Sequence, residues 1–276
     1  MIGIGASPGL SNLLAKLACE RLEHVDDLYT AWPVDAGAGI DEAPLDTDAA
    51  FGGGVSAALI HWMQQISGEI EVVEGGELVS RQPLAPVRLN FPGMGGGTAY
   101  TLGHPEPITL RERMGVRGRS ANLMLLQPST AAFLRVLRDE IDSGTLSLEA
   151  AGAQVIAPGT WRQAKALVLS LGCAGAGDLP FFFALARGMH DGRSLTVGVR
   201  ITSHPEGMDN ITGIPLALGL RQLLGHRLDA TGVHPPETVI EAKPLLEALA
   251  PSCDPLKRSF DELVVVTEAE GDGGDR

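Results

Sequence analysis

The chain opens on a turn of glycine and proline that leads directly into a helix. Residues 3–9 read Gly-Ile-Gly-Ala-Ser-Pro-Gly, and the polar pair Ser11 and Asn12 then precedes leucine and alanine residues at helical spacing. Serine and asparagine are favoured at helix starts, so a helix is predicted here. Such a turn normally follows a β-strand, and only Met1 and Ile2 stand before it. We therefore expect the chain to begin at an internal junction of a larger fold.

Composition sets the class of protein. The 276 residues include 44% hydrophobic and 20% charged residues, which is typical of a globular protein with a large core. A formal net charge of −13 argues against binding to nucleic acid or to anionic membranes. The start has no secretory signal pattern, and three widely spaced cysteines suit reduced thiols. A cytoplasmic protein without nucleic-acid or membrane partners is predicted.

Strand-like and helical segments follow one another along the whole chain. They predict an α/β (α+β) fold in which helices cover a mixed β-sheet. No convincing linker divides residues 1–267, so they are expected to form one domain, and the acidic, glycine-rich residues 268–276 are expected to form a disordered tail. Strands are predicted near 28–32, 69–73, 77–80, 87–91, 98–102, 194–201 and 263–266, and helices near 55–66, 129–141, 160–171, 211–224 and 238–249.

The opening turn has two interpretations. A dinucleotide-binding loop requires the spacing G-x-G-x-x-G between a strand and a helix. Here the third glycine is displaced by one position and Pro8 occupies the turn. The segment is either an altered pyrophosphate loop or a strand-to-helix turn that presents backbone groups to a ligand.

Two other segments are candidates for binding anions. Residues 52–54 are three glycines at a predicted helix start, where free N–H groups favour negative charge, although a flexible loop explains them equally well. Arg111, Arg113, Arg117 and Arg119 form a dense basic cluster that either clamps a carboxylate or phosphate or pairs with surface acids.

Motifs for metal binding are missing from the sequence, and hydrolysis is poorly supported. The seven histidines are scattered, and neither CxxC nor HExxH occurs. The letters of the nucleophile motif G-x-S-x-G occur at residues 5–9, but no full strand precedes them, as that motif requires. We therefore predict no metal.

Three segments together resemble the saccharopine dehydrogenase-like family. Residues 5–15 resemble the glycine-proline turn of that family. Residues 103–110, which read Gly-His-Pro-Glu-Pro-Ile-Thr-Leu, look like its G-H-x-E-x-x-T-L segment. Residues 232–237 are similar to its late G-V-x-x-P-E signature. The three matches occur in the order that the family shows.

The resemblance implies one half of a two-domain oxidoreductase. Family members carry an N-terminal Rossmann domain, followed by a substrate-binding and dimerisation domain. They use NAD or NADP to oxidise or form a carbon–nitrogen bond in amino-acid-like substrates such as saccharopine and carboxynorspermidine. The chain then corresponds to the second half. It is expected to be a homodimer and a truncated or split product that needs a separate Rossmann-domain polypeptide.

The resemblance also places candidate site residues. In members that use saccharopine, an arginine near the position of residues 49–59 grips a substrate carboxylate. Glycines stand there in this chain, which argues against saccharopine itself. The alternative function is a catalytically inactive, stand-alone domain for ligand binding or dimerisation. The predicted cofactor-binding residues are Ser7, Pro8 and Gly9, and the predicted substrate-binding residues are Ser11, Asn12, Gly53, Gly54, His104 and Glu106.

For two of these residues a structural explanation is equally good. His104 and Glu106 either line the cleft or form a satisfied pair inside a turn held by proline.

Overall fold

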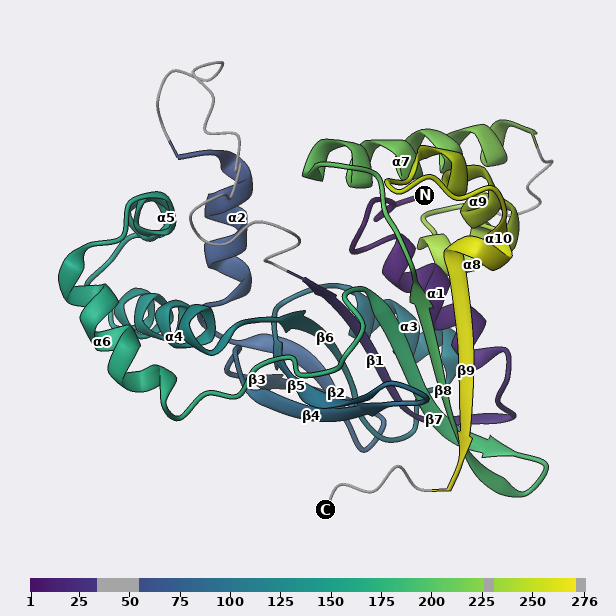
Figure 1. Ribbon diagram of the computed structural model, residues 1–276, viewed down its shortest axis with the longest axis horizontal. Coiled ribbons are helices and arrows are strands. Elements are labelled where there is room, and N and C mark those ends of the chain that lie inside the picture. Colours follow the sequence, from purple (N-terminus) through teal and green to yellow (C-terminus); the bar gives the residue numbers. More distant parts are fainter. Residues whose placement is uncertain (34–54, 226–230, 272–276) are drawn as a thin grey trace.

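The computed structural model describes residues 1–33, 55–225 and 231–271 (Figure 1). In these residues a mixed nine-stranded sheet is covered by helices, so the predicted α/β class is confirmed. The central order of the sheet is β3-β2-β6-β1-β7-β8-β9, and β4 and β5 form a hairpin that joins β6. The strands are His24–Pro33 (β1), Ile70–Glu74 (β2), Glu77–Arg81 (β3), Pro86–Phe91 (β4), Gly95–Thr101 (β5), Ser120–Leu125 (β6), Phe183–His190 (β7), Arg193–Ile201 (β8) and Val264–Glu270 (β9).

Helices form two groups, at two sides of the sheet (Figure 1). One group covers a face of β1, β7, β8 and β9, and the other packs near the end of β6. Within the described residues, no helix is both long and apolar enough to cross a membrane. The first group is Leu10–Cys19 (α1), Glu106–Met114 (α3), Met208–Gly225 (α7), Pro236–Val239 (α8), Ala242–Leu249 (α9) and Phe260–Leu263 (α10), with a 3-10 turn at Ala250–Ser252, and the second is Ala57–Gln65 (α2), Pro128–Asp142 (α4), Leu148–Ile156 (α5) and Thr160–Ser170 (α6).

β6 is the strand at which the sheet divides. It runs parallel to β1, whereas every other pairing between the described strands is antiparallel. At its start β6 pairs with β2, and at its end it pairs with β5. Three strands thus pair with β6, and its Asn122 lies opposite Thr30 of β1.

The two faces of the sheet have separate cores. Leu13 and Leu14 of α1 pack on the face that carries Ala184 and Val197. On the opposite face the β4–β5 hairpin folds over the sheet, and its Phe91 packs edge-on against Phe183 at a centroid distance of 5.3 Å.

The structure differs from the sequence prediction where burial hides the periodicity. All six residues of β6 are buried, so the strand shows no alternation of apolar and polar residues.

The helix predicted over 238–249 is divided into α8 and α9. The prediction of a tail from residue 268 is wrong for residues 268–270, because they pair with Leu195–Val197 as part of β9. Strands β6 and β7 and helices α3, α5 and α10 were not predicted.

Gly198 in the middle of β8 tests how closely the β4–β5 hairpin packs. A Cβ atom at this position would lie 2.5 Å from Cζ of Phe91. We expect Gly198→Val to lower the free energy of unfolding by about 1–3 kcal/mol, since the Phe91 ring has to move away. Chemical denaturation measures this loss. Gly213→Ala in α7, where a Cβ would meet no atom within 4 Å, is the matched control and should be neutral or slightly stabilising. Equal stability of the two variants would contradict this packing.

Candidate functional site

Polar side chains from distant parts of the sequence meet where α1, α3, β6 and α8 approach one another. Apart from Ser7, which is half-buried, they are buried. Hydrogen bonds connect them into one network, which we call the polar cluster. Its members are Ser7, Ser11, Asn12, His104, Glu106, Asn122 and Glu237.

The opening turn brings three of these side chains into place. The Gly5 N–H donates to the Pro8 carbonyl at 2.8 Å, and the Gly5 carbonyl accepts from the Leu10 N–H at 2.9 Å. Gly9 has a φ of 135°, and a Cβ atom on it would lie 2.2 Å from the Gly5 carbonyl oxygen. Only glycine fits there, because both the φ value and the contact exclude a side chain.

Helix α1 begins at Leu10, before the polar pair that suggested its start. Gly9 is the N-cap, and the Asn12 Oδ1 in the first turn accepts a hydrogen bond from the Gly9 N–H at 2.9 Å. Ser11 and Asn12 therefore lie inside the helix with their side chains turned into the cluster, rather than before it as caps.

Glu106 is the centre of the cluster. Its Oε1 accepts hydrogen bonds from Ser7 Oγ, from Ser11 Oγ at 2.8 Å and from Asn122 Nδ2 at 2.9 Å. Its Oε2 lies 3.1 Å from His104 Nδ1. Burial alone would raise the pKa of Glu106, but the hydrogen bond and charge of His104 and the two serine hydroxyls lower it below the usual value. Glu106 is thus a buried, ionised carboxylate.

Asn122 connects the cluster to the sheet. Its Nδ2 donates to Glu106, to Thr30 Oγ1 at 2.9 Å and to Ser7 Oγ at 3.1 Å. Its Oδ1 accepts from the Trp32 indole N–H at 2.9 Å. The parallel pair β1–β6 therefore fixes both the amide and the serine.

The pKa of Glu237 is shifted in the opposite direction to that of Glu106. Its Oε2 accepts from Asn12 Nδ2 at 2.9 Å, but its buried Oε1 has no hydrogen-bond partner among the described residues. Burial raises the pKa of Glu237, and the nearby negative charge of Glu106 adds to this effect. The surroundings thus shift the pKa values of the two carboxyl groups in opposite directions.

His104 faces the cluster with only one of its ring nitrogens. Nδ1 lies near Glu106 and 3.4 Å from Ser7 Oγ, and the ring lies 5.7 Å from that of Trp32. A nucleophilic serine would need its hydroxyl and the carboxylate on opposite nitrogens of the histidine. Both lie at Nδ1 here, so Ser7 is not activated in this way. Nε2 has no hydrogen bond to any described residue and is the nitrogen available for proton transfer.

The turn does not fit the pyrophosphate of a dinucleotide. That group requires free N–H groups at a helix start. The N–H groups of Gly9, Leu10 and Ser11 all donate within the turn and its helix. Of the predicted cofactor residues, Pro8 and Gly9 shape this turn, and only Ser7 adds a side chain to the cluster.

Metal and thiol chemistry find no support in the parts of the chain that the structure describes. No group of three or more histidine, cysteine, aspartate or glutamate side chains is arranged to hold a metal ion there. Burial raises the pKa of Cys19 to about 12 and that of Cys253 to about 11, so both are neutral thiols at pH 7.

Five of the predicted substrate and cofactor residues come together in the polar cluster. They are Ser7, Ser11, Asn12, His104 and Glu106. Gly53 and Gly54 lie outside the described residues.

Three residues of the site escaped prediction. Asn122 could have been recognised from the sequence, because it is an asparagine within a mostly apolar strand. Glu237 lies in the late motif that was identified, although its role was not. Trp32 carries no such signal, because an aromatic residue at a strand end is ordinary core.

Three of the four arginines of the basic cluster have partners within the protein. Arg111 pairs with Glu77 at 2.6 Å, and Arg119 pairs with Asp27 at 3.0 Å. Arg117 lies 3.1 Å from His24 Nδ1. Pairing of the arginines with surface acids is therefore what the structure shows for Arg111 and Arg119.

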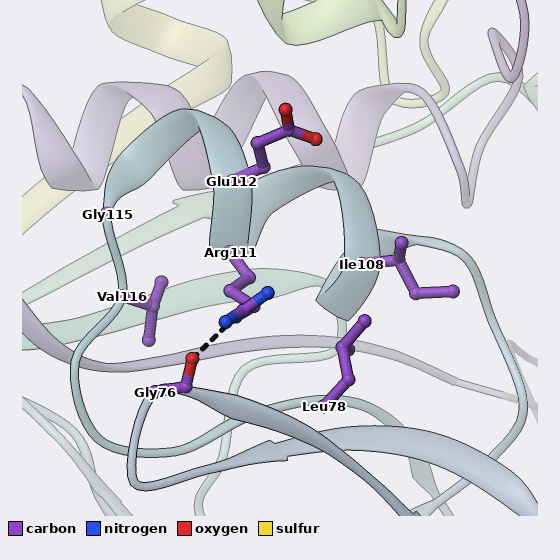
Figure 2. Close-up of a pocket in the computed structure, with 7 residues that line it drawn as sticks. All are labelled: Gly76, Leu78, Ile108, Arg111, Glu112, Gly115 and Val116. Atoms are coloured by element: carbon purple, nitrogen blue, oxygen red, sulfur yellow. Dashed lines mark hydrogen bonds between the residues drawn. The ribbon is translucent and has the colours of Figure 1, made fainter.

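A cavity of about 420 Å³ lies beneath α3, away from the polar cluster (Figure 2). Figure 2 shows Leu78 beside Ile108, and Arg111 pointing down to the Gly76 carbonyl, with an Nε–O distance of 2.5 Å. Glu112 points to the other side of the helix. The Arg111 charge in this cavity is already paired with Glu77.

Comparison with known proteins assigns no family. No family model matches the sequence, and no curated protein matches it. Among solved structures, the chain is similar to apo histidine-tagged saccharopine dehydrogenase (L-Glu forming) from Saccharomyces cerevisiae. The match has 12% sequence identity and a TM-score of 0.44, and covers 97% of this chain and 73% of that chain. A likeness at this level assigns neither a family nor an activity.

The two buried carboxyl groups should respond oppositely to pH. The lowered pKa of Glu106 stabilises the fold above about pH 4.5, and this stabilisation is lost as the pH falls through the lowered value. Because the pKa of Glu237 is raised, the folded state loses stability as the pH rises through that pKa. At pH 7 we expect Glu106→Gln to lower the free energy of unfolding by about 1–3 kcal/mol and Glu237→Gln to leave it unchanged or higher. Urea unfolding at pH 7 and pH 4 measures both, and a larger loss for Glu237→Gln would refute the assignment.

Proposed function

We propose that the chain is the substrate-binding half of a saccharopine dehydrogenase-like oxidoreductase that acts on a carbon–nitrogen bond. Its substrate is amino-acid-like, and a separate nucleotide-binding half supplies NAD or NADP. One observation carries the proposal. The three segments that resemble motifs of this family are far apart in the sequence, yet they meet in the polar cluster. Ser7 and Ser11 bind Glu106, and Asn12 binds Glu237.

Contact between the three segments supports the resemblance independently of any overall likeness. Residues 5–15, 103–110 and 232–237 were selected by their sequence patterns alone. Chance matches would have no reason to place their polar residues within hydrogen-bond distance. A shared site gives all three patterns one physical cause.

The proposed chemistry assigns His104 the proton of the substrate amine. Oxidation of a carbon–nitrogen bond releases a proton from nitrogen, so the substrate half needs a group that accepts it. Nε2 of His104 is available for this, and Glu106 orients the ring through Nδ1. Glu106 is then a positioning residue that also stabilises the charged imidazole.

In this proposal the Trp32 ring packs against the substrate amine. The ring lies beside His104, and its indole N–H is held by Asn122. A cationic amine above an aromatic ring and near an ionised carboxylate is electrostatically favoured. The same surroundings disfavour an anionic group at this position.

The nucleotide belongs to the other half in this proposal. The N–H groups at the start of α1 are already used, so the chain has no pyrophosphate cradle in the turn. The only parallel pair among the described strands is β1–β6, whereas a dinucleotide-binding fold needs several adjacent parallel strands.

The alternative is a stand-alone domain that binds a ligand or dimerises without catalysis. Most hydrogen-bonding atoms of the cluster are satisfied within the chain, as in a network that only holds the fold together. In the oxidoreductase proposal His104 Nε2 accepts a proton during catalysis. In the alternative His104 contributes only to the stability of the fold.

Turnover of a secondary amine by the chain with its nucleotide-binding partner tests the proposal. The partner is recovered from source cells with the tagged chain as bait. NAD and NADP reduction is then followed with saccharopine and with carboxynorspermidine, alongside nicotinamide fluorescence. We expect turnover with the partner and none with the chain alone. No turnover and no fluorescence change with the partner present would leave only the binding-domain alternative.

A pair of histidine variants separates catalysis from stability. His104→Asn keeps a donor to Glu106 in place of Nδ1 but removes Nε2, so we expect turnover to fall at least about 100-fold at unchanged melting temperature. The matched control is His204→Asn, because His204 stands in a similar His-Pro-Glu sequence and its Nδ1 lies 2.7 Å from the Pro205 carbonyl, away from the polar cluster. Equal turnover in the two variants would exclude the proposed role of His104.

A further inference from the structure

Helix α6 exposes an unusual amount of apolar surface. Leu171 at its end is 90% exposed, and Trp161 is 76% exposed. Between them Leu167 is 71% exposed and Val168 is 69% exposed. Large apolar side chains that gather on one exposed helix normally mark a binding surface.

The exposed residues form one stripe on the side that faces away from the protein. Ala166 is buried against α4, where it packs with Ala132 and Val136. Trp161, Ala164, Val168 and Leu171 lie on the opposite side at 100° per residue. Figure 1 shows α6 at the left edge of the molecule, beside α4. We refer to these four residues and Leu167 as the α6 stripe.

We infer that the α6 stripe is the contact surface of a homodimer in which the α6 helices of two copies pack antiparallel. The spacing of the stripe supports this arrangement. Four of its residues follow one another at intervals of 3, 4 and 3, which is the repeat of a helix–helix seam: Trp161, Ala164, Val168 and Leu171. They are also symmetric about residue 166. A two-fold axis there places Trp161 opposite Leu171 of the second copy and Ala164 opposite Val168.

The area of the stripe matches what a stable dimer needs. The exposed fractions of its four large side chains correspond to roughly 400–500 Å² of apolar surface per copy. A standard interface buries about 800 Å² per partner, of which somewhat more than half is apolar. The two values agree.

Charge also favours a second copy at this position. The chain carries a formal net charge of −13, so two copies repel each other over most of their surface. Residues 156–172 contain no aspartate or glutamate, and they include the basic residues Arg162 and Lys165. Arg162 is held by Glu140 at 2.8 Å, beside the buried side of the helix. Two copies therefore approach with little repulsion along α6.

The oligomeric state of the full chain tests the inference. Sedimentation velocity at low micromolar concentration should show a dimer for the native sequence. Trp161→Glu combined with Leu171→Glu should raise the dimer dissociation constant at least 100-fold, since it places like charges opposite each other. Far-UV circular dichroism and the melting temperature show whether the fold is retained. A monomeric native chain, or a variant that remains dimeric, would overturn the inference.

Two further variants test the position and the direction of the contact. Leu216→Glu with Leu224→Glu changes two leucines of α7 that are 51% and 80% exposed, and it should leave the dimer intact. Trp161→Lys with Leu171→Glu should dimerise more tightly than the double glutamate variant, because the antiparallel arrangement pairs each lysine with a glutamate. Loss of the dimer in the α7 variant, or equal dissociation constants for the two α6 variants, would contradict the α6 contact. The test needs neither substrate nor nucleotide, so it is independent of the proposed function.

Discussion

The Glu106 carboxylate is the interaction on which the arrangement of the site depends. It is fully buried and ionised, so it needs several donors to replace lost hydration. The opening turn supplies two of these donors, β6 supplies one, and His104 supplies the fourth. Any rearrangement that separates these segments would leave a charge unpaired in the interior. The carboxylate thus holds together elements that are about a hundred residues apart.

The position of this carboxylate follows from the sheet. The parallel pair β1–β6 sets Thr30 beside Asn122, and the amide then reaches both Glu106 and Ser7. In a buried strand an asparagine is costly unless each polar atom is satisfied. The network satisfies both ends of the Asn122 side chain, and it fixes the His104 ring as a consequence. The geometry of the histidine is therefore determined by the strand that lies behind it.

The sequence allowed five members of the polar cluster to be predicted but not how they are connected. Glycine-proline turns and His-x-Glu patterns are local, so Ser7, Ser11, Asn12, His104 and Glu106 were recognisable. The pairing of Asn12 with Glu237 spans 225 residues and depends on the tertiary fold. Strand β6 was missed for a related reason: a strand buried on both faces loses the alternation by which strands are recognised. Long-range contacts and double-sided burial are the features that local patterns do not report.

The polar cluster and the α6 stripe lie in different parts of the fold, and this separation has a mechanical consequence. The cluster sits among α1, α3 and α8, whereas α6 packs on α4 in the other helical group (Figure 1). Pairing through α6 would therefore leave the turn at the start of α1 uncovered in both copies. A nucleotide-binding half that approaches this turn would meet no obstacle from the dimer contact. The two proposed partners, a second copy and a nucleotide-binding half, are thus compatible on one chain.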